Sequence, residues 1–539
     1  MTATVADTST DLGLTLHKDV AVPTRDGTVL RADVFRPTEP GRYPVIMTHG
    51  PYGKDIHFEN FNPTAYALIE ERGPFMNWET VNPEWWVPQG YVVIRVDSRG
   101  TGKSPGQMEL VGPQEPRDFY DAIEWAGGQG WSNGKVGLLG ISYYAIGQWA
   151  VAALRPPHLA AICVWEGAVE LYREWAYHGG ILSNAFTDAW WPRQITGNQN
   201  AAAGQENPGK AVGENVELPA VLREHRLLDD FYAERTPDLS AIEVPVLSAG
   251  NWAGYALHLR GNIEGWAAAG SAQKWLELHA GNHFAPFYSL ESRLYQKRFL
   301  DHFLTSASDT WNEAPVKVFV RTPEGGDFRD EQEWPIARTV WTTVALDATT
   351  GTLAEAAGEA ASVSYPAPDG GCVFYSAPFA EDTEVTGALS LALWVEADAQ
   401  DMDVFVTLFY VGADGHEVSF EDASGLRGPI TKGWLRVSHR ELDEARSTPA
   451  RPLHVHTSTA PLTPGEPVLA QVEIVPTSIV FRPGSRLGLA IESHDRVEPS
   501  RFLHNDPVDR SPLVFGGRNT IHTGGAYASS LLLPVIPPR

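Results

Sequence analysis

The fold prediction begins with Val136-Gly137-Leu138-Leu139-Gly140-Ile141-Ser142-Tyr143-Tyr144. The apolar run Val136–Leu139 precedes a Gly-x-Ser tripeptide, and the small-residue stretch 145–154 follows it. This order predicts a strand, a sharp turn and then a helix. A serine at such a turn projects at the carboxyl edge of a sheet, where the next backbone N–H and the helix N-terminus stabilise an oxyanion. Ser142 is therefore the candidate nucleophile, although Tyr144 replaces the usual glycine and the tripeptide also fits a structural turn.

Short apolar runs on both sides of this stretch are typical of buried parallel strands. They are Pro44–Thr48, Tyr91–Val96, Ala160–Trp165, Val244–Ser248 and Lys274–Leu278. The segments between them are long enough for the crossover helices that a mostly parallel sheet requires. Before them, the alternating pattern of Val20–Pro37 with Asp26-Gly27 near its centre predicts a hairpin. The order of these elements predicts an α/β-hydrolase sheet.

Changes in composition divide the chain into four predicted segments. The α/β-hydrolase domain covers residues 1–165 and, in a second part, residues 242–312. Between them, residues 166–241 are rich in Trp, Tyr, Gly and Asn, which predicts a helical cap inserted over the site. From 313 to 539, short β-prone segments separated by Pro and Gly predict a C-terminal jelly-roll-like β-sandwich. The predicted fold class is therefore α/β, with a second, all-β domain.

The charge balance limits the kind of partner. The chain has 41 Lys and Arg against 67 Asp and Glu, a formal net charge of −26. Such an acidic surface argues against nucleic acid as a partner, because the phosphate backbone would be repelled. No apolar run approaches the length of a membrane span, and residues 1–13 lack the basic start and apolar core of a signal peptide. We therefore expect a cytoplasmic protein with a small-molecule substrate and no membrane partner.

Cysteines and histidines give no metal-binding pattern. The two cysteines, Cys163 and Cys372, lie far apart and are expected to be free. The histidines at 178, 279, 454 and 456 show no ligand spacing with cysteines or carboxylates. We therefore predict no catalytic metal and no cofactor.

Five motifs occur in a defined order over nearly the whole chain. They are Val22-Pro23-Thr24-Arg25-Asp26-Gly27, Pro51-Tyr52-Gly53-Lys54, Asp97-Ser98-Arg99-Gly100-Thr101-Gly102-Lys103-Ser104, Gly140-Ile141-Ser142-Tyr143 and His504-Asn505-Asp506-Pro507. In content and order they resemble the serine hydrolases grouped with cocaine esterase, α-amino-acid ester hydrolases, glutaryl cephalosporin acylases and X-prolyl dipeptidyl peptidases (the CocE/NonD hydrolases). This resemblance implies that Ser142 is the nucleophile.

The resemblance also implies an oxyanion hole and a base. The family uses a tyrosine hydroxyl and the N–H after the serine, and Tyr52 and Tyr143 match these positions; the alternative for Tyr52 is a packing role. The predicted base is His283, which follows a glycine shortly after the last strand of the sheet, as the histidine of the family does. His279 falls at the end of that strand and is expected to be packed.

The acid is where this chain departs from the family. Ala253 stands where the relatives have the aspartate that orients the histidine, and alanine cannot accept the imidazole proton. Glu166 follows the strand after the nucleophile strand, so it is the predicted replacement, unless it pairs with a cap arginine such as Arg173. Glu264 is a second candidate, although we expect it on the following helix.

These residues predict a serine hydrolase that cleaves a carboxylic ester or an amide through an acyl-enzyme. Four tryptophans are expected to line the acyl pocket, or else to belong to the core: Trp165, Trp175, Trp190 and Trp252. An ester is favoured because residues 250–254 offer no carboxylate to an α-ammonium group. One alternative is a binding protein that lost turnover with the aspartate; others are acylase, acyl-transfer or lyase chemistry at the same serine. Members of this family often assemble, which leaves room for a homo-oligomer.

Overall fold

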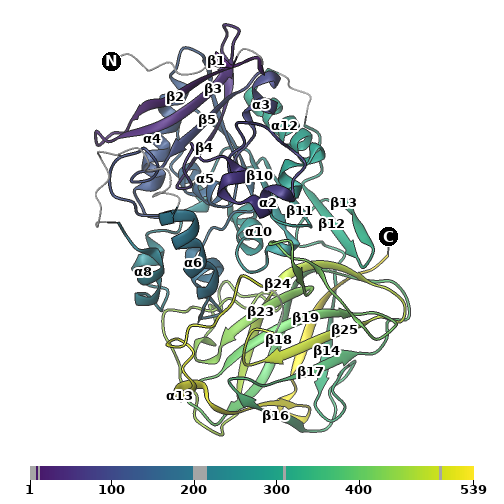
Figure 1. Cartoon of the computed structure of the whole chain (residues 1–539). Helices are drawn as coiled ribbons and strands as arrows, with labels where there is room; N and C mark the ends of the chain where they lie inside the picture. The colour runs from purple at the N-terminus through teal and green to yellow at the C-terminus, as the bar shows by residue number, and fades with distance from the viewer. Residues whose placement is uncertain (1–7, 10–11, 198–214, 307–310, 497–499, 539) are drawn as a thin grey trace.

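The computed structural model describes residues 8–9, 12–197, 215–306, 311–496 and 500–538. Its centre is a mostly parallel sheet in the order β3-β5-β4-β6-β7-β10-β11-β12 (Figure 1). The parallel strands are β4 (Tyr43–Gly50), β5 (Val92–Asp97), β6 (Ser132–Ile141), β7 (Leu159–Trp165), β10 (Val246–Asn251), β11 (Lys274–His279) and β12 (Val316–Thr322). Every residue of β5 and β10 is buried, as expected for strands covered on both faces.

An antiparallel hairpin precedes this sheet at its edge, as its sequence predicts. It consists of β2 (Leu14–Pro23) and β3 (Val29–Pro37), and β1 (Thr8–Ser9) pairs with β2. The turn uses Gly27 at φ +89°, a conformation that glycine adopts without strain. Because β3 pairs antiparallel with β5, the hairpin continues the main sheet.

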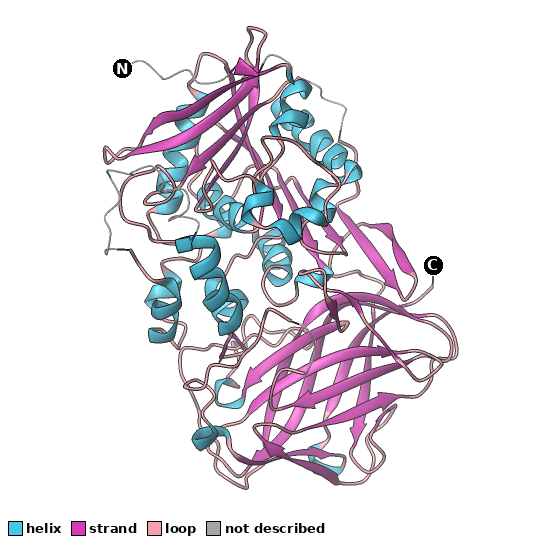
Figure 2. Ribbon diagram, viewed as in Figure 1, coloured by secondary structure: helices cyan, strands magenta, loops and turns pink. Residues whose placement is uncertain are grey.

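Helices cover both faces of the parallel sheet (Figure 2). The longer ones are α4 (Glu115–Gly127), α5 (Tyr143–Ala153), α10 (Leu259–Ala268) and α12 (Leu290–Leu304). Phe119 of α4 and Trp149 of α5 belong to one buried cluster, whereas Phe299 and Leu300 of α12 belong to another. Shorter helices are α1 (Phe58–Phe61), α2 (Pro63–Ala67), α3 (Pro83–Trp86), η2 (Val87–Gln89) and α11 (Ala285–Tyr288).

The chain between β7 and β10 forms a separate set of short elements. They are η3 (Tyr172–Ala176), β8 (Tyr177–His178), β9 (Ile181–Leu182), α6 (Asn184–Trp190), η4 (Trp191–Thr196), α8 (Leu218–Glu224), α9 (Asp230–Ala233) and η5 (Leu239–Ala241). Residues 198–214 of the predicted cap lie outside the described part of the chain. In Figure 1, α6 and α8 lie between the α/β domain and the C-terminal strands.

The C-terminal part of the chain is almost entirely β-structure with its own core. Its strands are β13 (Gly325–Glu331), β14 (Val340–Asp347), β15 (Thr352–Ala354), β16 (Ala361–Ala367), β17 (Gly371–Ser376), β18 (Thr383–Ala397), β19 (Asp403–Val411), β20 (Glu417–Val418), β21 (Phe420–Glu421), β22 (Arg427–Gly428), β23 (Thr431–Arg436), β24 (Val468–Phe481), β25 (Arg486–Glu492), β26 (Gly517–Thr523) and β27 (Ser530–Ile536), with α13 (Pro512–Phe515), η7 (Val437–His439) and η8 (Gly525–Tyr527). Leu389, Leu391, Leu393 and Val395 alternate along β18 and are all fully buried, as expected for a strand that turns one face to a core.

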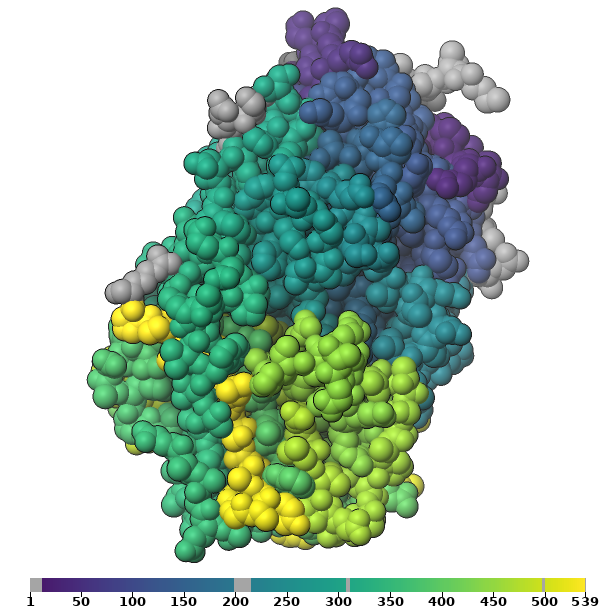
Figure 3. Space-filling model, turned by 180° about the vertical axis from the view of Figure 1, so that it is seen from behind, coloured from purple at the N-terminus to yellow at the C-terminus, as the bar shows by residue number. Residues whose placement is uncertain are grey.

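The α/β domain and the β-rich unit are joined directly. β12 pairs with β11 of the parallel sheet and, at Arg321, with Ile479 of β24. The two parts meet along a continuous surface, seen from behind in Figure 3. The predicted combination of an α/β-hydrolase domain with a second, β-rich domain is confirmed; the jelly-roll connectivity and the domain boundaries stay predictions. In the part of the chain that the structure describes, no helix has both the length and the apolar character needed to cross a membrane.

Candidate active site

Ser142 lies at a sharp turn between β6 and α5. β6 ends at Ile141, α5 begins at Tyr143, and Ser142 between them has φ +76° and ψ −102°. A side chain at Gly140 would place its Cβ only 2.6 Å from the Cβ of Tyr144, so glycine is needed two residues before the serine. Strained backbone of this kind costs about 1–3 kcal/mol and persists only where the surrounding structure enforces it. The turn holds the serine at the carboxyl end of the sheet.

The hydrogen-bond partner of the serine is His258. Its Nε2 lies 3.0 Å from Ser142 Oγ, and the residue directly precedes α10. Burial, reinforced by the charge of His283, lowers the pKa of His258 to about 3. A neutral imidazole has a lone pair, so this ring can accept the serine proton. His258 was not among the residues that the sequence singled out.

His283 lies behind His258. The two rings are stacked, with centroids 4.9 Å apart and planes 9° from parallel. His283 Nδ1 lies 2.6 Å from Glu166 Oε2, and Nε2 lies 3.3 Å from Glu79 Oε1. Burial lowers the pKa of His283, but the adjacent carboxylates, Glu166 above all, outweigh burial and raise it. The structure therefore engages both nitrogens of the predicted base with carboxylates and gives the serine a different histidine.

Glu166 occupies the place that the sequence predicts for the acid. It directly follows β7, is fully buried and has φ +51°. Besides His283, it accepts hydrogen bonds from Asn251 Nδ2 at 3.1 Å and His279 Nε2 at 3.2 Å. Burial raises the pKa of Glu166, but the two histidines outweigh it and hold the pKa below its usual range. The carboxyl group is therefore ionised.

The alternatives considered for the acid have other partners. Glu264 lies on α10 and forms an ion pair with Arg451. Arg173, the proposed cap partner of Glu166, pairs with Glu170 instead. Glu264 therefore does not take the position of Glu166, and Arg173 does not pair with Glu166.

Another residue of the site, Glu79, was also missed by the sequence analysis. Its Oε1 faces His283, its backbone oxygen accepts the N–H of Ile141 at 3.1 Å, and burial raises its pKa to about 6. Glu79, Ser142 and Glu166 are three of the seven non-glycine residues with positive φ in the described chain. Their convergence marks a strained site, which is common where a protein holds reactive groups. No sequence motif precedes or includes Glu79, so only the tertiary structure reveals it.

The two predicted oxyanion residues lie beside the serine turn. The rings of Tyr52 and Tyr143 have centroids 6.0 Å apart. The Tyr52 hydroxyl accepts a hydrogen bond from Trp190 Nε1 at 3.2 Å, which leaves its own proton available. The Tyr143 hydroxyl is engaged with Val111 and Glu115. Burial raises the pKa of both tyrosines well above the usual value, so both stay protonated.

The four predicted pocket tryptophans separate into two pairs. Trp190 bonds Tyr52 and packs on Trp175, with ring centroids 5.2 Å apart. Trp165 stacks on His279 behind Glu166, and Trp252 donates to Phe319 O at 2.8 Å, so these two are enclosed in the protein core. Trp175 and Trp190 are therefore the pair on the Tyr52 side of the site.

Among the residues that the structure describes, two groups have spacings that could hold a metal ion. Ligand atoms of Glu166, His258 and His283 lie within 4.8 Å of one another, but a hydrogen bond already joins Glu166 to His283. The second group consists of Asp19, Asp33 and Asp55, and all three carboxylates face the Lys54 ammonium. Positive charge is thus supplied by protein side chains in both groups. The absence of a catalytic metal stays a prediction.

Comparisons with known proteins cover nearly the whole chain. A model of the X-Pro dipeptidyl-peptidase (S15 family) matches residues 26–285, and one of the X-Pro dipeptidyl-peptidase C-terminal non-catalytic domain matches residues 309–532. Cocaine esterase of Rhodococcus sp. (strain MB1 Bresler) is 24% identical, over 98% of this chain and 99% of the esterase. A crystal structure of a CocE/NonD family hydrolase from Staphylococcus aureus is 34% identical and superposes with a TM-score of 0.90, over 97% of this chain and 94% of that one. An α-amino acid ester hydrolase is 18% identical with a TM-score of 0.72 over 98% of each chain, a likeness of fold.

Proposed function

Because the chain belongs to the CocE/NonD family of hydrolases, we propose that it cleaves carboxylic esters of small molecules through an acyl-enzyme on Ser142. The family prediction is confirmed, as is the predicted class, a hydrolase of esters or amides, and a protein without turnover is not favoured. The observation that carries the proposal is the 3.0 Å contact between Ser142 Oγ, on its strained turn, and His258 Nε2. A hydroxyl so placed can lose its proton to the ring as it attacks a carbonyl carbon.

In the first step the Ser142 oxygen bonds to the ester carbonyl carbon while its proton moves to His258 Nε2. The carbonyl oxygen becomes negative and His258 becomes positive. The Glu166 carboxylate favours that positive charge, since its effect on the pKa of His258 is upward. The same proton then passes from His258 to the departing alkoxide, and the acyl group remains on the serine.

His283 and Glu79 affect how readily His258 takes up a positive charge. A proton on His283 opposes a second positive charge on the ring stacked against it. Glu79 Oε1 lies 3.3 Å from His283 Nε2 and, with a pKa of about 6, can take that proton as His258 becomes charged. We therefore assign His258 as the base and His283, Glu166 and Glu79 as positioning residues that act through it.

The oxyanion is stabilised by Tyr52 and by the backbone N–H of Tyr143. The phenol remains protonated and has a free proton to donate, as described above. Tyr143 is the first residue of α5, so its N–H has no partner within the helix. In other enzymes, removal of one such donor raises the activation barrier by about 3–4 kcal/mol.

Water completes the cycle. It gives a proton to His258 Nε2 as its oxygen attacks the acyl carbon, and that proton returns to Ser142 as the acyl–serine bond breaks. An ester is proposed as the substrate because both Glu166 oxygens are already engaged with protein donors and so offer no free site for an α-ammonium group. The relative named cocaine esterase, which the chain matches over 99% of that protein's length, supports this choice.

The test is hydrolysis of a p-nitrophenyl acyl series, together with an α-amino ester and an X-Pro amide. Variants Ser142→Ala, His258→Gln and His283→Gln are compared with wild type, and labelling by a fluorophosphonate identifies the nucleophile. We expect no labelling and no turnover for Ser142→Ala, and a loss on the order of a thousandfold or more for His258→Gln. Full loss in His283→Gln with activity kept in His258→Gln would instead make His283 the base. Failure of wild type to label would overturn the serine mechanism.

A further inference from the structure

Trp190 connects the proposed oxyanion tyrosine to α6. It is the last residue of that helix, and its Nε1 donates a hydrogen bond to the Tyr52 hydroxyl at 3.2 Å. This bond uses a lone pair of the hydroxyl oxygen and leaves its proton free for the oxyanion. Burial and Glu79 raise the pKa of Tyr52, whereas the bond from Trp190 acts in the opposite direction and makes the hydroxyl a stronger donor. The position of α6 therefore matters for the proposed reaction.

The first turn of α6 is bound by the 500–511 loop, which precedes α13 in the β-rich unit. The N-cap side chain of α6 forms no capping bond among the described residues, and the Ala185 N–H donates to Leu503 O at 3.2 Å. Asn184 Nδ2 donates to Asn505 Oδ1 at 2.8 Å, and the Asn505 N–H donates to Asn184 Oδ1 at 2.9 Å. The first N–H groups of a helix need partners from outside it. The β-rich unit supplies such a partner to α6.

Charged side chains hold α6 to the same loop. Arg223 of α8 donates from Nε to Asp506 Oδ2 at 3.0 Å and forms a 2.7 Å ion pair with Asp188 of α6. The N–H of Leu182, just before α6, donates to Asp509 Oδ2 at 3.1 Å. Asp506 and Asp509 are both buried, and a buried charge is costly unless it is paired. These contacts therefore restrict movement of α6 away from the loop.

Four stacked aromatic rings lead from this loop to the serine turn. In order they are Phe502, Phe186, Trp190 and Tyr143, with successive ring centroids 4.9, 6.2 and 6.5 Å apart and planes at 24°, 22° and 20°. Offset stacked rings at such separations attract one another. A shift of α6 would therefore move the ring that lies against both oxyanion residues.

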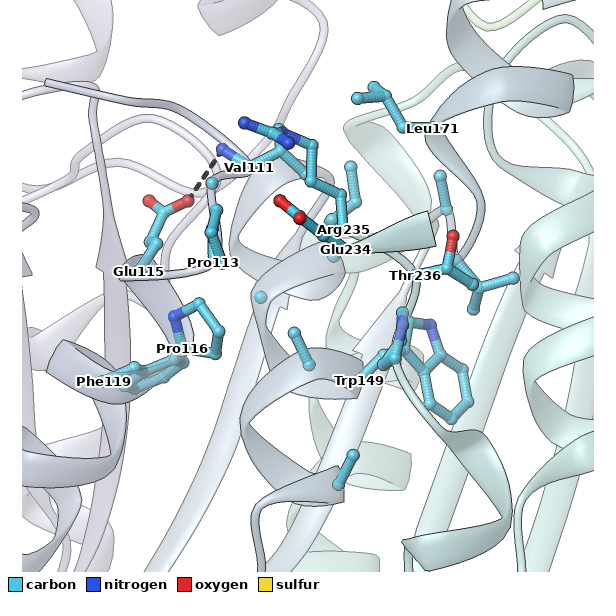
Figure 4. A pocket seen from close by; sticks show the side chains of 18 of the residues that line it. Val111, Pro113, Glu115, Pro116, Phe119, Trp149, Leu171, Glu234, Arg235 and Thr236 are labelled. Carbon is cyan, nitrogen blue, oxygen red and sulfur yellow. Dashed lines mark hydrogen bonds between the residues drawn. The ribbon is translucent and has the colours of Figure 1, made fainter. Parts of the chain in front are cut away.

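Packing on the other side of Trp190 does not fix α6 independently. Trp175 packs on Trp190, but the Trp175 N–H is itself bound by Thr187 of α6 at 2.9 Å. Trp175 also borders a cavity of about 310 Å³, whose wall includes Trp149 and Leu171 (Figure 4). A side chain beside a cavity lacks protein packing on that side. The contacts with the β-rich unit are thus important for the placement of α6.

We propose that the 500–511 loop positions Tyr52 for oxyanion stabilisation, through α6 and Trp190. Its positioning residues are Asn505 and Asp506, which bind α6 and its partner Arg223. The inference rests on the ester hydrolysis proposed above. It gives a role to the last of the five sequence motifs, and it assigns a contribution to catalysis to a unit whose family model is described as non-catalytic.

Hydrolysis of p-nitrophenyl esters by Asn505→Ala and Asp506→Asn tests the proposal. We expect each substitution to lower kcat about tenfold, less than the roughly hundredfold or more that follows loss of a whole oxyanion donor. A double-mutant cycle with Tyr52→Phe distinguishes positioning from general destabilisation. In the absence of the Tyr52 hydroxyl, the same two substitutions should change kcat by less than about twofold. Circular dichroism confirms that the variants are folded.

Glu264→Gln is the matched control. It removes the ion pair with Arg451, which is another contact between the α/β domain and the β-rich unit, and it should keep wild-type kcat with or without the Tyr52 hydroxyl. Hydrogen exchange followed by mass spectrometry gives a second readout, which does not need turnover. Exchange in peptides that cover α6 should be faster in Asn505→Ala and Asp506→Asn than in wild type, and unchanged in Glu264→Gln.

Three results would overturn the proposal. They are wild-type kcat in both loop variants, equal losses of kcat with and without the Tyr52 hydroxyl, and unchanged exchange at α6 in both loop variants. Failure of the proposed esterase function is recognised separately, as a wild type that hydrolyses no ester. The exchange measurement would still show in that case whether the loop holds α6.

Discussion

Two groups of buried histidines in this molecule have opposite charge states. His279 and His283, which contact Glu166, have raised pKa values, whereas His439 and His454 of the β-rich unit have pKa values lowered to about 4 and about 3. Burial lowers the pKa in every case, so burial does not explain the difference. His283 lies against the carboxylates of Glu166 and Glu79.

The second group has different neighbours. His439 Nδ1 lies 3.1 Å from Nδ1 of His456, and the nearby charges that lower these pKa values come from Arg436 and Arg173. Contact with a carboxylate thus keeps a buried histidine charged, and contact with another imidazole near a guanidinium keeps it neutral. The same residue type supplies a charged positioning group in one place and an uncharged packing group in the other.

Of the variants proposed here, Glu166→Gln should have the largest effect, because it removes a carboxylate that keeps His283 charged. The amide keeps the shape but removes the charge that stabilises the imidazolium at His258, so we expect kcat to fall on the order of a thousandfold. The measurement is p-nitrophenyl ester hydrolysis by purified variants. Glu264→Gln is the matched control, because Glu264 is paired with Arg451, and it should keep wild-type activity. A Glu166→Gln enzyme with more than a tenth of wild-type kcat would exclude Glu166 from the role proposed.

Glu79→Gln should have a smaller effect, about a hundredfold on kcat/KM, the low end of what a proton-transfer group contributes. Burial raises the pKa of Glu79 to about 6, so below this pH Glu79 is protonated and cannot accept the proton of His283. Wild-type kcat/KM should therefore fall as the pH drops through about 6. Profiles measured from pH 5 to 8 should lack this decline in Glu79→Gln. An unchanged decline in the variant would assign it to another group.

The smallest effect is expected for His456→Gln. This variant tests, through the free energy of unfolding, whether the second group of histidines is uncharged. The pKa of His456 is lowered well below 6.5 by burial and Arg173, so below pH 6.5 the unfolded chain binds a proton that the folded chain does not. Acid therefore favours unfolding of wild type relative to the variant. Between pH 7.5 and 5, the unfolding free energy of wild type minus that of the variant should decrease by about 2 kcal/mol.

Urea unfolding followed by circular dichroism at both pH values measures this difference. His416→Gln, at an exposed position of the β-rich unit, is the control and should show no such change. A difference for His456→Gln that stays constant with pH would mean that His456 is protonated in the folded protein.

The sequence located two of the groups that meet in the site because their positions follow from strand order. Ser142 and Glu166 come directly after β6 and β7, and these neighbouring strands pair in parallel with Ile141 opposite Trp165. Parallel strands bring their carboxyl ends to one edge, so residues at those ends lie side by side. Tyr52 was located differently, by its resemblance to a family motif. These placements needed only local patterns and one topological rule.

The tertiary structure alone decided which histidine contacts the serine and which carboxylates surround the other. His258, His283 and Glu79 lie in loops or at helix starts, where no periodicity sets the direction of a side chain. His258 lacks a motif, and Glu79 is brought in by a loop that hydrogen-bonds β6 at Ile141. A strand end is placed by the hydrogen bonds of the sheet, whereas a loop side chain is placed by packing against residues up to 204 positions away, as between Glu79 and His283.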